Sequence, residues 1–276
     1  EDDATGVQVT FNDGSCEHFD IVIGADGLHS TTRALAFGDE TRFAHPLGFC
    51  FAGFSMPNRF ALDREAIISN VPGRMAAIYA AGYQPDTVFV LLAFAHTYRP
   101  AREKSEVAFQ QHLTAKVFAD TNWQLPVLLE EMRQAKDFYF DSVEQMRMPT
   151  WSSGRVVLVG DAAYAPSFLT GQGSSLALTG GYVLASELAN HKDHRAAFAA
   201  YERKMRPFVE MNQATVTEGK ASMIPVTSEQ LEQRIVSLRA FSSTPANADT
   251  ARAVHSALDL SEYDDGPEYR NRAEKP

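Results

Sequence analysis

Two carboxylates, each placed just after a strand end that contains glycine, are the residues whose positions best suit ligand binding. Asp26 lies in the sequence Gly-Ala-Asp-Gly at residues 24–27, and Asp161 directly follows Gly160. Ligands of α/β sheets collect outside the carboxyl ends of the strands, where a carboxylate can accept hydrogen bonds from sugar hydroxyls. Asp161 is therefore a candidate for binding a ribose or ribityl hydroxyl.

A predicted helix start follows Asp161 along the chain. Its residues are Gly171, Gln172, Gly173 and Ser174. Backbone N–H groups at a helix start favour negative charge, and glycines let a ligand approach the backbone closely. A nicotinamide-type Gly-x-Gly fingerprint does not fit, because it belongs in the tight turn directly after its strand. A carboxylate that caps a turn, with glycines that permit tight packing, explains the same spacing, so both interpretations stay open.

The turn after the earlier strand repeats this pattern. Gly27 follows Asp26, Ser30 is placed to cap a helix, and Arg33 lies one helical turn further on. The Arg33 guanidinium could bind a pyrophosphate or form a salt bridge with Asp26. For this segment alone, a structural turn with a capped helix is the simpler interpretation.

Two buried strands must carry these carboxylates, and continuous apolar runs predict them at residues 19–24 and 155–160. Between them, strand-forming residues broken by turn signals predict a mostly antiparallel sheet. Further strands are expected at residues 7–11, 47–54, 66–69, 75–80, 87–94 and 138–143. Helices are expected at residues 30–37, 103–118, 126–134, 173–189, 195–212 and 228–241, and the charged tail from Ser261 is expected to fray. An α/β domain interrupted by a β-rich insertion is the simplest architecture.

Composition excludes several classes of function. The 276 residues are 45% hydrophobic and carry a net charge of −10, so neither a nucleic-acid surface nor an anionic membrane is an expected partner. The cysteines, Cys16 and Cys50, show no disulfide spacing, which favours a reducing cytoplasm. His191 and His194 have no further ligands nearby in the sequence, so no metal site is expected.

Together these segments resemble the FAD-dependent monooxygenases that include p-hydroxybenzoate hydroxylase, the polyketide aromatic hydroxylases and the tetracycline destructases. The sequence Gly-Ala-Asp-Gly-Leu-His-Ser-Thr-Thr-Arg at residues 24–33 resembles the family's second cofactor motif. Residues 160–173 resemble its third motif, whose Asp holds the ribityl chain. The resemblance covers roughly residues 6 to 212 and continues through the sequence Tyr-Glu-Arg-Lys-Met-Arg-Pro at residues 201–207.

The resemblance implies the site residues and cofactors. The cofactor is FAD, with NADPH or NADH as reductant, and its expected ligands are Asp26, Gly27, Arg33, Gly160, Asp161, Gly171, Gln172, Gly173 and Ser174. One face of the antiparallel sheet roofs the substrate pocket in this family, so substrate contacts are expected from Phe49, Phe51, Met75, Tyr79, Phe89 and Leu91, with Phe168 beside the flavin ring. No side chain is assigned as a general acid or base.

This chain departs from the family pattern in three ways. Tyr164 stands where the family commonly has His, and Phe168 stands where the family often has proline. The family's first motif, an N-terminal strand-turn-helix with Gly-x-Gly-x-x-Gly for the ADP part, does not precede residues 19–24. A missing N-terminal segment or a companion chain is therefore expected to supply it.

The predicted protein is a flavoprotein monooxygenase that uses NAD(P)H and O₂ to hydroxylate an aromatic or polycyclic small molecule, with a tetracycline-like compound as one possibility. Its expected parts are an incomplete Rossmann-like FAD-binding domain at residues 1–43 and 150–212, a substrate-binding sheet domain at 44–149 and a helical region at 213–276. A flavin-dependent dehydrogenase or reductase on the same scaffold, and a non-catalytic flavoprotein fragment acting as a binding module, are the alternatives.

Overall fold

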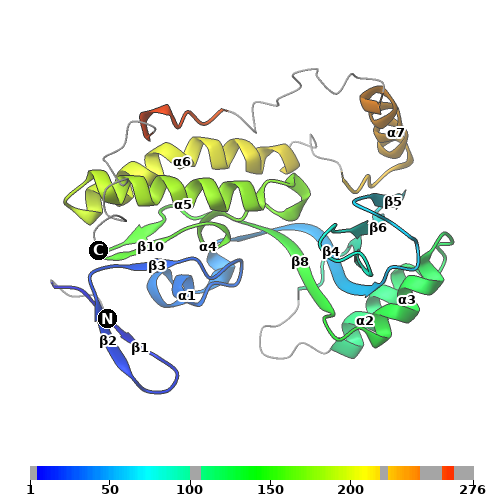
Figure 1. Cartoon of the computed structure of the whole chain (residues 1–276), viewed down its shortest axis with the longest axis horizontal. Helices are drawn as coiled ribbons and strands as arrows, with labels where there is room; N and C mark the ends of the chain where they lie inside the picture. The colour runs from blue at the N-terminus through cyan, green and yellow to red at the C-terminus, as the bar shows by residue number, and fades with distance from the viewer. Residues whose placement is uncertain (1–4, 100–106, 218–222, 243–256, 264–276) are drawn as a thin grey trace, which may run out of the picture. The chain divides into compact units, whose positions relative to one another are not determined.

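The computed structural model of the chain describes residues 5–99, 107–217, 223–242 and 257–263. Its residues divide into two compact units (Figure 1). The first unit comprises residues 1–45, 144–220 and 249–276, and the second comprises residues 46–143 and 221–248. The helical region expected as a separate part after residue 213 is thus shared between the two units.

The first unit is an α/β structure with helices packed beside short strands. Its elements are β1 (Val7–Thr10), β2 (Cys16–Phe19), β3 (Val22–Gly24), α1 (Thr31–Phe37), η1 (Glu40–Arg42), β9 (Ser152–Ser153), β10 (Val156–Leu158), α4 (Asp161–Tyr164), η2 (Phe168–Thr170), α5 (Gly173–Asn190), α6 (His194–Thr217) and η3 (Ser261–Tyr263). Strands β1 and β2 form an antiparallel hairpin, and β3 pairs in parallel with β10, the central strand of a sheet in the order β3-β10-β9. Helices α5 and α6 run side by side (Figure 1).

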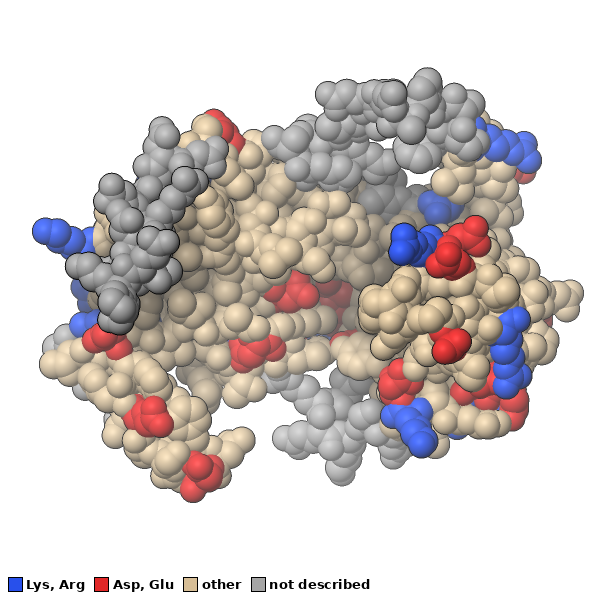
Figure 2. Space-filling view, in the orientation of Figure 1, with Lys and Arg blue, Asp and Glu red and all other residues tan. Residues whose placement is uncertain are grey.

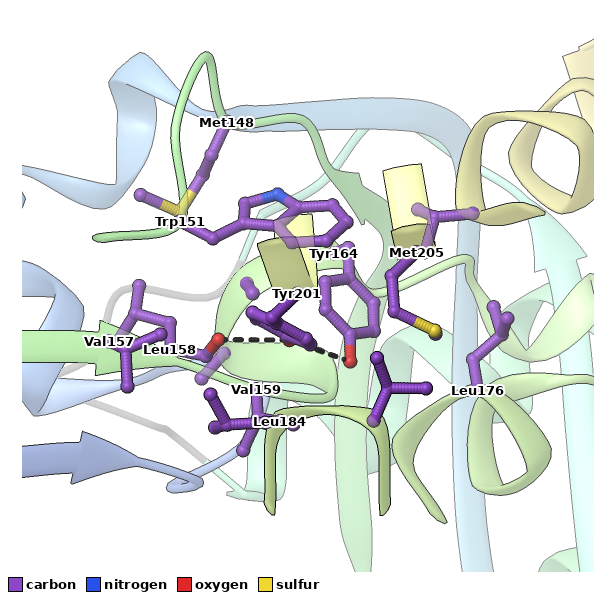
Figure 3. Packing of buried hydrophobic residues seen from close by; sticks show 14 of the residues in the cluster. Met148, Trp151, Val157, Leu158, Val159, Tyr164, Leu176, Leu184, Tyr201 and Met205 are labelled. Atoms are coloured by element: carbon purple, nitrogen blue, oxygen red, sulfur yellow. Dashed lines mark hydrogen bonds between the residues drawn. The ribbon is translucent and has the colours of Figure 1, made fainter. Parts of the chain in front are cut away.

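The core of the first unit lies around Trp151, Tyr164 and Tyr201. The three side chains are 1% exposed or less. The ring centroids of Tyr164 and Tyr201 lie 4.5 and 5.6 Å from that of Trp151. Figure 3 shows them packed together with Met148, Leu158 and Met205. Burial of these large rings is the main stabilising contribution in this unit, since each removes a large apolar area from water.

The second unit is built on an antiparallel sheet in the order β5-β6-β7-β4-β8. The strands are β4 (Ala44–Pro57), β5 (Ala66–Val71), β6 (Arg74–Ala80), β7 (Thr87–Ala95) and β8 (Tyr139–Met146), and the helices are α2 (Val107–Val117), α3 (Leu125–Gln134) and α7 (Ser228–Ser242). Strand alternation sends Cys50, Phe54 and Phe94 to a core face, where α2 and α3 contribute Leu113 and Leu128.

The expected mixture of a small parallel sheet, a mostly antiparallel sheet and helices is confirmed. Three local predictions differ from the structure. The buried strand expected at residues 19–24 is divided, because Phe19 ends the hairpin strand β2 and β3 begins only at Val22; Phe19 and Ile23 are 37% and 45% exposed. The interval between β10 and α5, expected as a loop, contains α4 and η2. The tail expected to fray from Ser261 includes η3, where Tyr263 is 7% exposed and donates a hydrogen bond to Glu187. The remainder of that tail, and the expected helix residues 103–106, lie outside the described residues.

Candidate functional site

The two carboxylates lie beyond the same ends of two neighbouring parallel strands. Gly24, the last residue of β3, is the register partner of Leu158, the last residue of β10. The Val159 backbone N–H donates to the Gly24 carbonyl at 2.9 Å, which extends the pairing by one step. Because parallel strands end at a common edge, Asp26 and Asp161 follow at one edge of this sheet.

Asp161 is the first residue of α4 and lies against the start of α5. A Cβ atom built on Gly173 would lie 3.9 Å from Asp161 Oδ1. Gly160, at φ +66°, turns the chain here, and a Cβ on it would lie 3.2 Å from the Ala177 Cβ in α5. Within the described residues, no side chain hydrogen-bonds the carboxylate, and burial raises its pKa above the ordinary value of 3.8. The site therefore holds a desolvated carboxylate whose oxygens are available to a ligand.

The first turn of α5 is not capped by the side chain of its N-cap residue. Gln172 is its N-cap residue but forms no capping hydrogen bond through its side chain, and Gly171 before it has the left-handed φ of +67°. Ser174 is exposed. Over the 18 residues of α5 the peptide dipoles align, so its first turn favours negative charge beside Asp161.

Asp26 is bonded by its own helix. It accepts hydrogen bonds from Ser30 Oγ at 2.5 Å, from the Thr32 backbone N–H at 2.9 Å and from Thr32 Oγ1 at 3.1 Å. Burial alone would raise the Asp26 pKa, but these hydrogen bonds outweigh it and lower the pKa below 3.8. Ser30 also caps α1, as predicted, by accepting from the Arg33 N–H at 2.8 Å. Gly27 has φ +79°, and a Cβ on it would meet only open space.

The assignment of Arg33 to a pyrophosphate is corrected by the structure. Its side chain is fully buried and donates to the carbonyls of Ala162 at 2.8 Å and Leu28 at 2.6 Å. It also forms a salt bridge with Glu40. A guanidinium without exposed surface cannot reach a ligand phosphate, so Arg33 joins the turn after β3 to helix α4 instead.

Residues of α6 hold the turn that carries Asp161. The Tyr201 hydroxyl lies 3.1 Å from the Leu158 carbonyl and 3.1 Å from the Tyr164 hydroxyl (Figure 3). Because a carbonyl only accepts, Tyr201 donates to Leu158 and accepts from Tyr164. Leu158 precedes Asp161 and Tyr164 follows it, so one side chain fixes both flanks of the turn.

Gly180 of α5 makes room for this arrangement. A Cβ on Gly180 would lie 1.9 Å from the Tyr164 hydroxyl oxygen, closer than real atoms approach. Tyr164, which stands where the family commonly has His, therefore points into the interior and is only 1% exposed.

Gln213, further along α6, holds the segment after α4. Its side-chain amide donates to the carbonyls of Met146 at 2.8 Å, Ala165 at 3.2 Å and Tyr164 at 3.3 Å. The backbone carbonyl of Gln213 accepts a hydrogen bond from Gln145 Nε2 at 2.9 Å. This segment leads to Ser167, which has the unfavourable φ of +77° for a residue with a side chain. The partly buried Phe168 comes next, so its backbone position is tightly set.

The candidate substrate residues in the second unit share one face of the sheet. Cross-strand partners lie on the same face, and Phe51 and Met75 both pair with Ala93. Phe49 lies two residues from Phe51 and therefore on the same face. This face is opposite the one that packs against α2 and α3.

The remaining three candidates continue this face. Leu91 pairs with Gly53 of β4, and Phe89 pairs with Tyr79 of β6. The Phe89 and Tyr79 rings stack with centroids 5.5 Å apart. Met75 is fully buried and therefore cannot contact a substrate, which corrects its assignment. Tyr79 is 43% exposed, and the other four are partly buried. Aromatic residues thus border a centre of small residues on a largely apolar surface.

Sequence reasoning missed Tyr201, Gln213 and the partner of Phe51 on β8, Tyr139. The Phe51 and Tyr139 ring centroids lie 5.7 Å apart. Alternation within the predicted strand 138–143 places Tyr139 opposite the core residue Phe140 and could have identified it. No local signal in the sequence indicates the contacts of Tyr201 and Gln213.

On the face shown in Figure 2, Lys and Arg side chains are scattered in small groups, several of them beside Asp or Glu. Among the described residues, no group of three potential metal ligands occurs, and no helix is both long and apolar enough to cross a membrane.

The fold and this edge define a domain of the α/β class that binds a nucleotide-type cofactor beyond parallel strand ends. A family model described as an FAD binding domain matches residues 1–216. The chain belongs to this FAD binding domain family.

The chain is also similar to flavin-dependent monooxygenases. It is 39% identical over 231 residues to a flavin-dependent monooxygenase of an unknown prokaryotic organism, covering 83% of this chain and 60% of that protein. It is 39% identical over 239 residues to an uncharacterized Mycobacterium tuberculosis protein, covering 86% of this chain and 64% of the relative. The chain thus spans less than two thirds of the length of these relatives.

Among solved structures, the tetracycline destructase Tet(55) matches with a TM-score of 0.76 and 34% identity, covering 94% of this chain and 67% of that one. Tet(51) matches with the same TM-score and 32% identity. These similarities confirm the predicted resemblance to the aromatic-hydroxylase group of flavoproteins.

Proposed function

We propose that the protein to which this chain belongs is an FAD-dependent monooxygenase that uses NAD(P)H and O₂ to hydroxylate an aromatic or polycyclic small molecule. The observation that supports it most directly is the Asp161 carboxylate, desolvated, without a side-chain partner among the described residues, and placed against the start of α5. A ribityl or ribose hydroxyl would satisfy this carboxylate, so these residues fit FAD.

Each part of the chain would have a distinct task. Bound FAD supplies the redox and oxygen chemistry, which side chains cannot perform. Asp161 would bind a sugar hydroxyl, and the first turn of α5, from Gly173, would stabilise negative charge on the flavin ring. Phe168 would lie beside that ring. The apolar sheet face of the second unit would offer a surface to a flat substrate. Tetracycline destructases among the similar structures make a tetracycline-like polyketide one candidate substrate.

The companion chain and the cytoplasmic location stay predictions. A companion chain has no support from the comparisons. The cytoplasmic location rests on the free cysteines Cys16 and Cys50 alone. Nothing in the proposed chemistry depends on either.

The test is oxygen incorporation by the whole flavin-loaded protein. With NADPH or NADH, ¹⁸O₂ and a panel of polyketide and phenolic aromatics, we expect product that carries one ¹⁸O atom, detected by mass spectrometry. Substrate oxidation without ¹⁸O would instead support the dehydrogenase alternative. An Asp161→Ala protein that retains FAD as tightly as the wild type would contradict the cofactor site.

A further inference from the structure

On the ligand-facing side of the sheet, one polar pair interrupts the apolar surface. Tyr139 and Asp141 alternate with Phe140 along β8, and Phe140 packs in the core, 6.2 Å from Phe94. Tyr139 and Asp141 therefore lie on the opposite face, the face of Phe51. Neither residue is among the expected cofactor ligands or the expected apolar substrate contacts.

The pair is built around a buried carboxylate. The Tyr139 hydroxyl donates to Asp141 Oδ2 at 2.7 Å, and the Ser142 backbone N–H donates to Asp141 Oδ1 at 2.8 Å. Asp141 is 2% exposed, whereas Tyr139 is 50% exposed. The carboxylate is thus buried, and the phenol is the part of the pair that a ligand can reach.

The direction of this hydrogen bond fixes what the phenol can offer. Burial, and then the hydrogen bond and charge of Asp141, raise the pKa of Tyr139 far above its ordinary value of 10.0. The phenol therefore keeps its proton, and that proton is donated to Asp141. What remains is the lone pair of the Tyr139 oxygen, which accepts hydrogen bonds.

We propose that Tyr139, oriented by Asp141, is a substrate-recognition residue that accepts a hydrogen bond from a phenolic or enolic hydroxyl of a flat substrate resting on the face of Phe51 and Phe49. The inference rests on the proposed function, and it names the residue that distinguishes a substrate with a hydrogen-bond donor from one without. A ligand without an O–H or N–H donor would leave the phenol oxygen unpaired when it covers it, which costs binding free energy.

The test uses two probes that differ by one donor. 2-Naphthol carries an O–H group, and 2-methoxynaphthalene is its methyl ether. Binding of each to the full chain is measured by ligand-observed NMR titration, which requires no turnover. We expect wild type to prefer naphthol by about three- to tenfold, the ratio that one net hydrogen bond provides. Tyr139→Phe keeps the ring and should bring this ratio to about one without weakening binding of the ether.

A matched variant tests whether the preference depends on this tyrosine in particular. Tyr83→Phe alters a tyrosine that is 77% exposed and is not among the expected substrate contacts. It should keep the preference for naphthol. In Asp141→Asn, the amide can donate to the Tyr139 oxygen, which turns the phenol proton toward the ligand and should shift the preference toward the ether. Thermal melts confirm that each variant is folded.

The inference is overturned if wild type shows no preference or binds neither probe, or if Tyr139→Phe keeps the wild-type ratio. These outcomes are distinguishable from failure of the proposed function. A lost preference together with ¹⁸O incorporation removes only the role of Tyr139. A preference that depends on Tyr139, in a protein that never incorporates oxygen, removes only the monooxygenase assignment.

Discussion

The turns after β3 and β10 have the same outline but opposite internal chemistry. Each follows a parallel strand, contains glycine and carries one carboxylate. Asp26 is saturated by Ser30 and Thr32 from its own helix, which lowers its pKa. Asp161 receives no such bonds, and burial raises its pKa. The turn with a satisfied carboxylate stabilises itself, whereas the turn with an unsatisfied one is held from outside by α5 and α6.

This contrast indicates how a binding carboxylate can be kept available. A free carboxylate contributes nothing to the stability of its own turn, so other residues must fix the backbone. In the second turn Tyr201, Gln213 and the close packing at Gly180 have this role. Asp26 and Asp161 should therefore respond differently to the same substitution.

The largest effect is expected from Gly180→Ala, which breaks the external support of the second turn. The new Cβ would lie 1.9 Å from the Tyr164 oxygen, and this oxygen is fixed by its bond to Tyr201. Overpacking of this kind should lower the free energy of unfolding by about 3 kcal/mol. Urea denaturation of the variant measures it.

Gly181→Ala is the matched control, because a Cβ there meets nothing within 4 Å. It should stabilise the helix by up to about 1 kcal/mol. Combining Gly180→Ala with Tyr164→Phe removes the clashing oxygen and should recover part of the loss. Equal behaviour of the two glycine variants would show that the second turn does not depend on this packing.

Asp161→Ala should separate binding from stability. Loss of a charged hydrogen bond to a sugar hydroxyl should weaken FAD binding by roughly ten- to a hundredfold, equivalent to about 1.5–3 kcal/mol. The free energy of unfolding without cofactor should not fall, because the variant removes a desolvated charge. Flavin absorbance per protein and urea denaturation of the apoprotein give the two quantities. A destabilised apoprotein would mean that Asp161 supports its own turn after all.

Asp26→Ala should lower stability more than it lowers FAD affinity, the reverse of Asp161→Ala, and its effects should be smaller. It removes the acceptor of Ser30 and Thr32, so the free energy of unfolding should fall by about 1 kcal/mol. FAD affinity should change less than in Asp161→Ala. The same two measurements, made side by side, test this. If Asp26→Ala costs more cofactor affinity than Asp161→Ala, the assignments of the two carboxylates must be exchanged.

The smallest effect is a difference in pH dependence. Because the pKa of Asp26 is lowered in the folded protein, the ionised carboxylate contributes to the free energy of unfolding above about pH 4. This contribution is lost as the pH falls through the folded-state pKa. The raised pKa of Asp161 has the opposite sign. Its protonated form favours the folded state, so stability is greater below about pH 4 and is lost as the pH rises through the folded-state value.

Urea denaturation of the apoprotein from pH 3 to 7 would separate these contributions. The stability advantage of wild type over Asp26→Ala should shrink toward acid. Relative to Asp161→Asn, wild type should lose stability from about pH 4 upward. Parallel curves for both variants would contradict the contrast between the turns.

The sequence predicted the strands and long helices well, because their apolar periodicity is strong and their ends carry clear signals. Ser30 is an example, since its hydroxyl is directly visible as a cap. Helix α4 was missed because it has only four residues, Asp161–Tyr164, too few for a periodic pattern.

Site residues were predictable where the motif is local and not where the contact is remote. Asp161 and Gly173 follow from their positions after a strand and at a helix start. Arg33 was misassigned because its charge suggested a ligand, whereas its burial depends on Glu40 and Ala162 in the folded chain. Tyr201 and Gln213 lie 37 and 49 residues from their partner Tyr164, and no spacing rule connects them.

The two attachments of α6 also constrain how this chain can change over evolutionary time. Tyr201 fixes one part of the turn and Gln213 the segment after it, and both project from the same continuous helix. Inserting or deleting one residue between them would rotate Gln213 by about 100° relative to Tyr201 and detach one of the two. In sequences that diverge from this one, the interval should therefore contain no gaps, while the hairpin tip around Asp13 can vary in length.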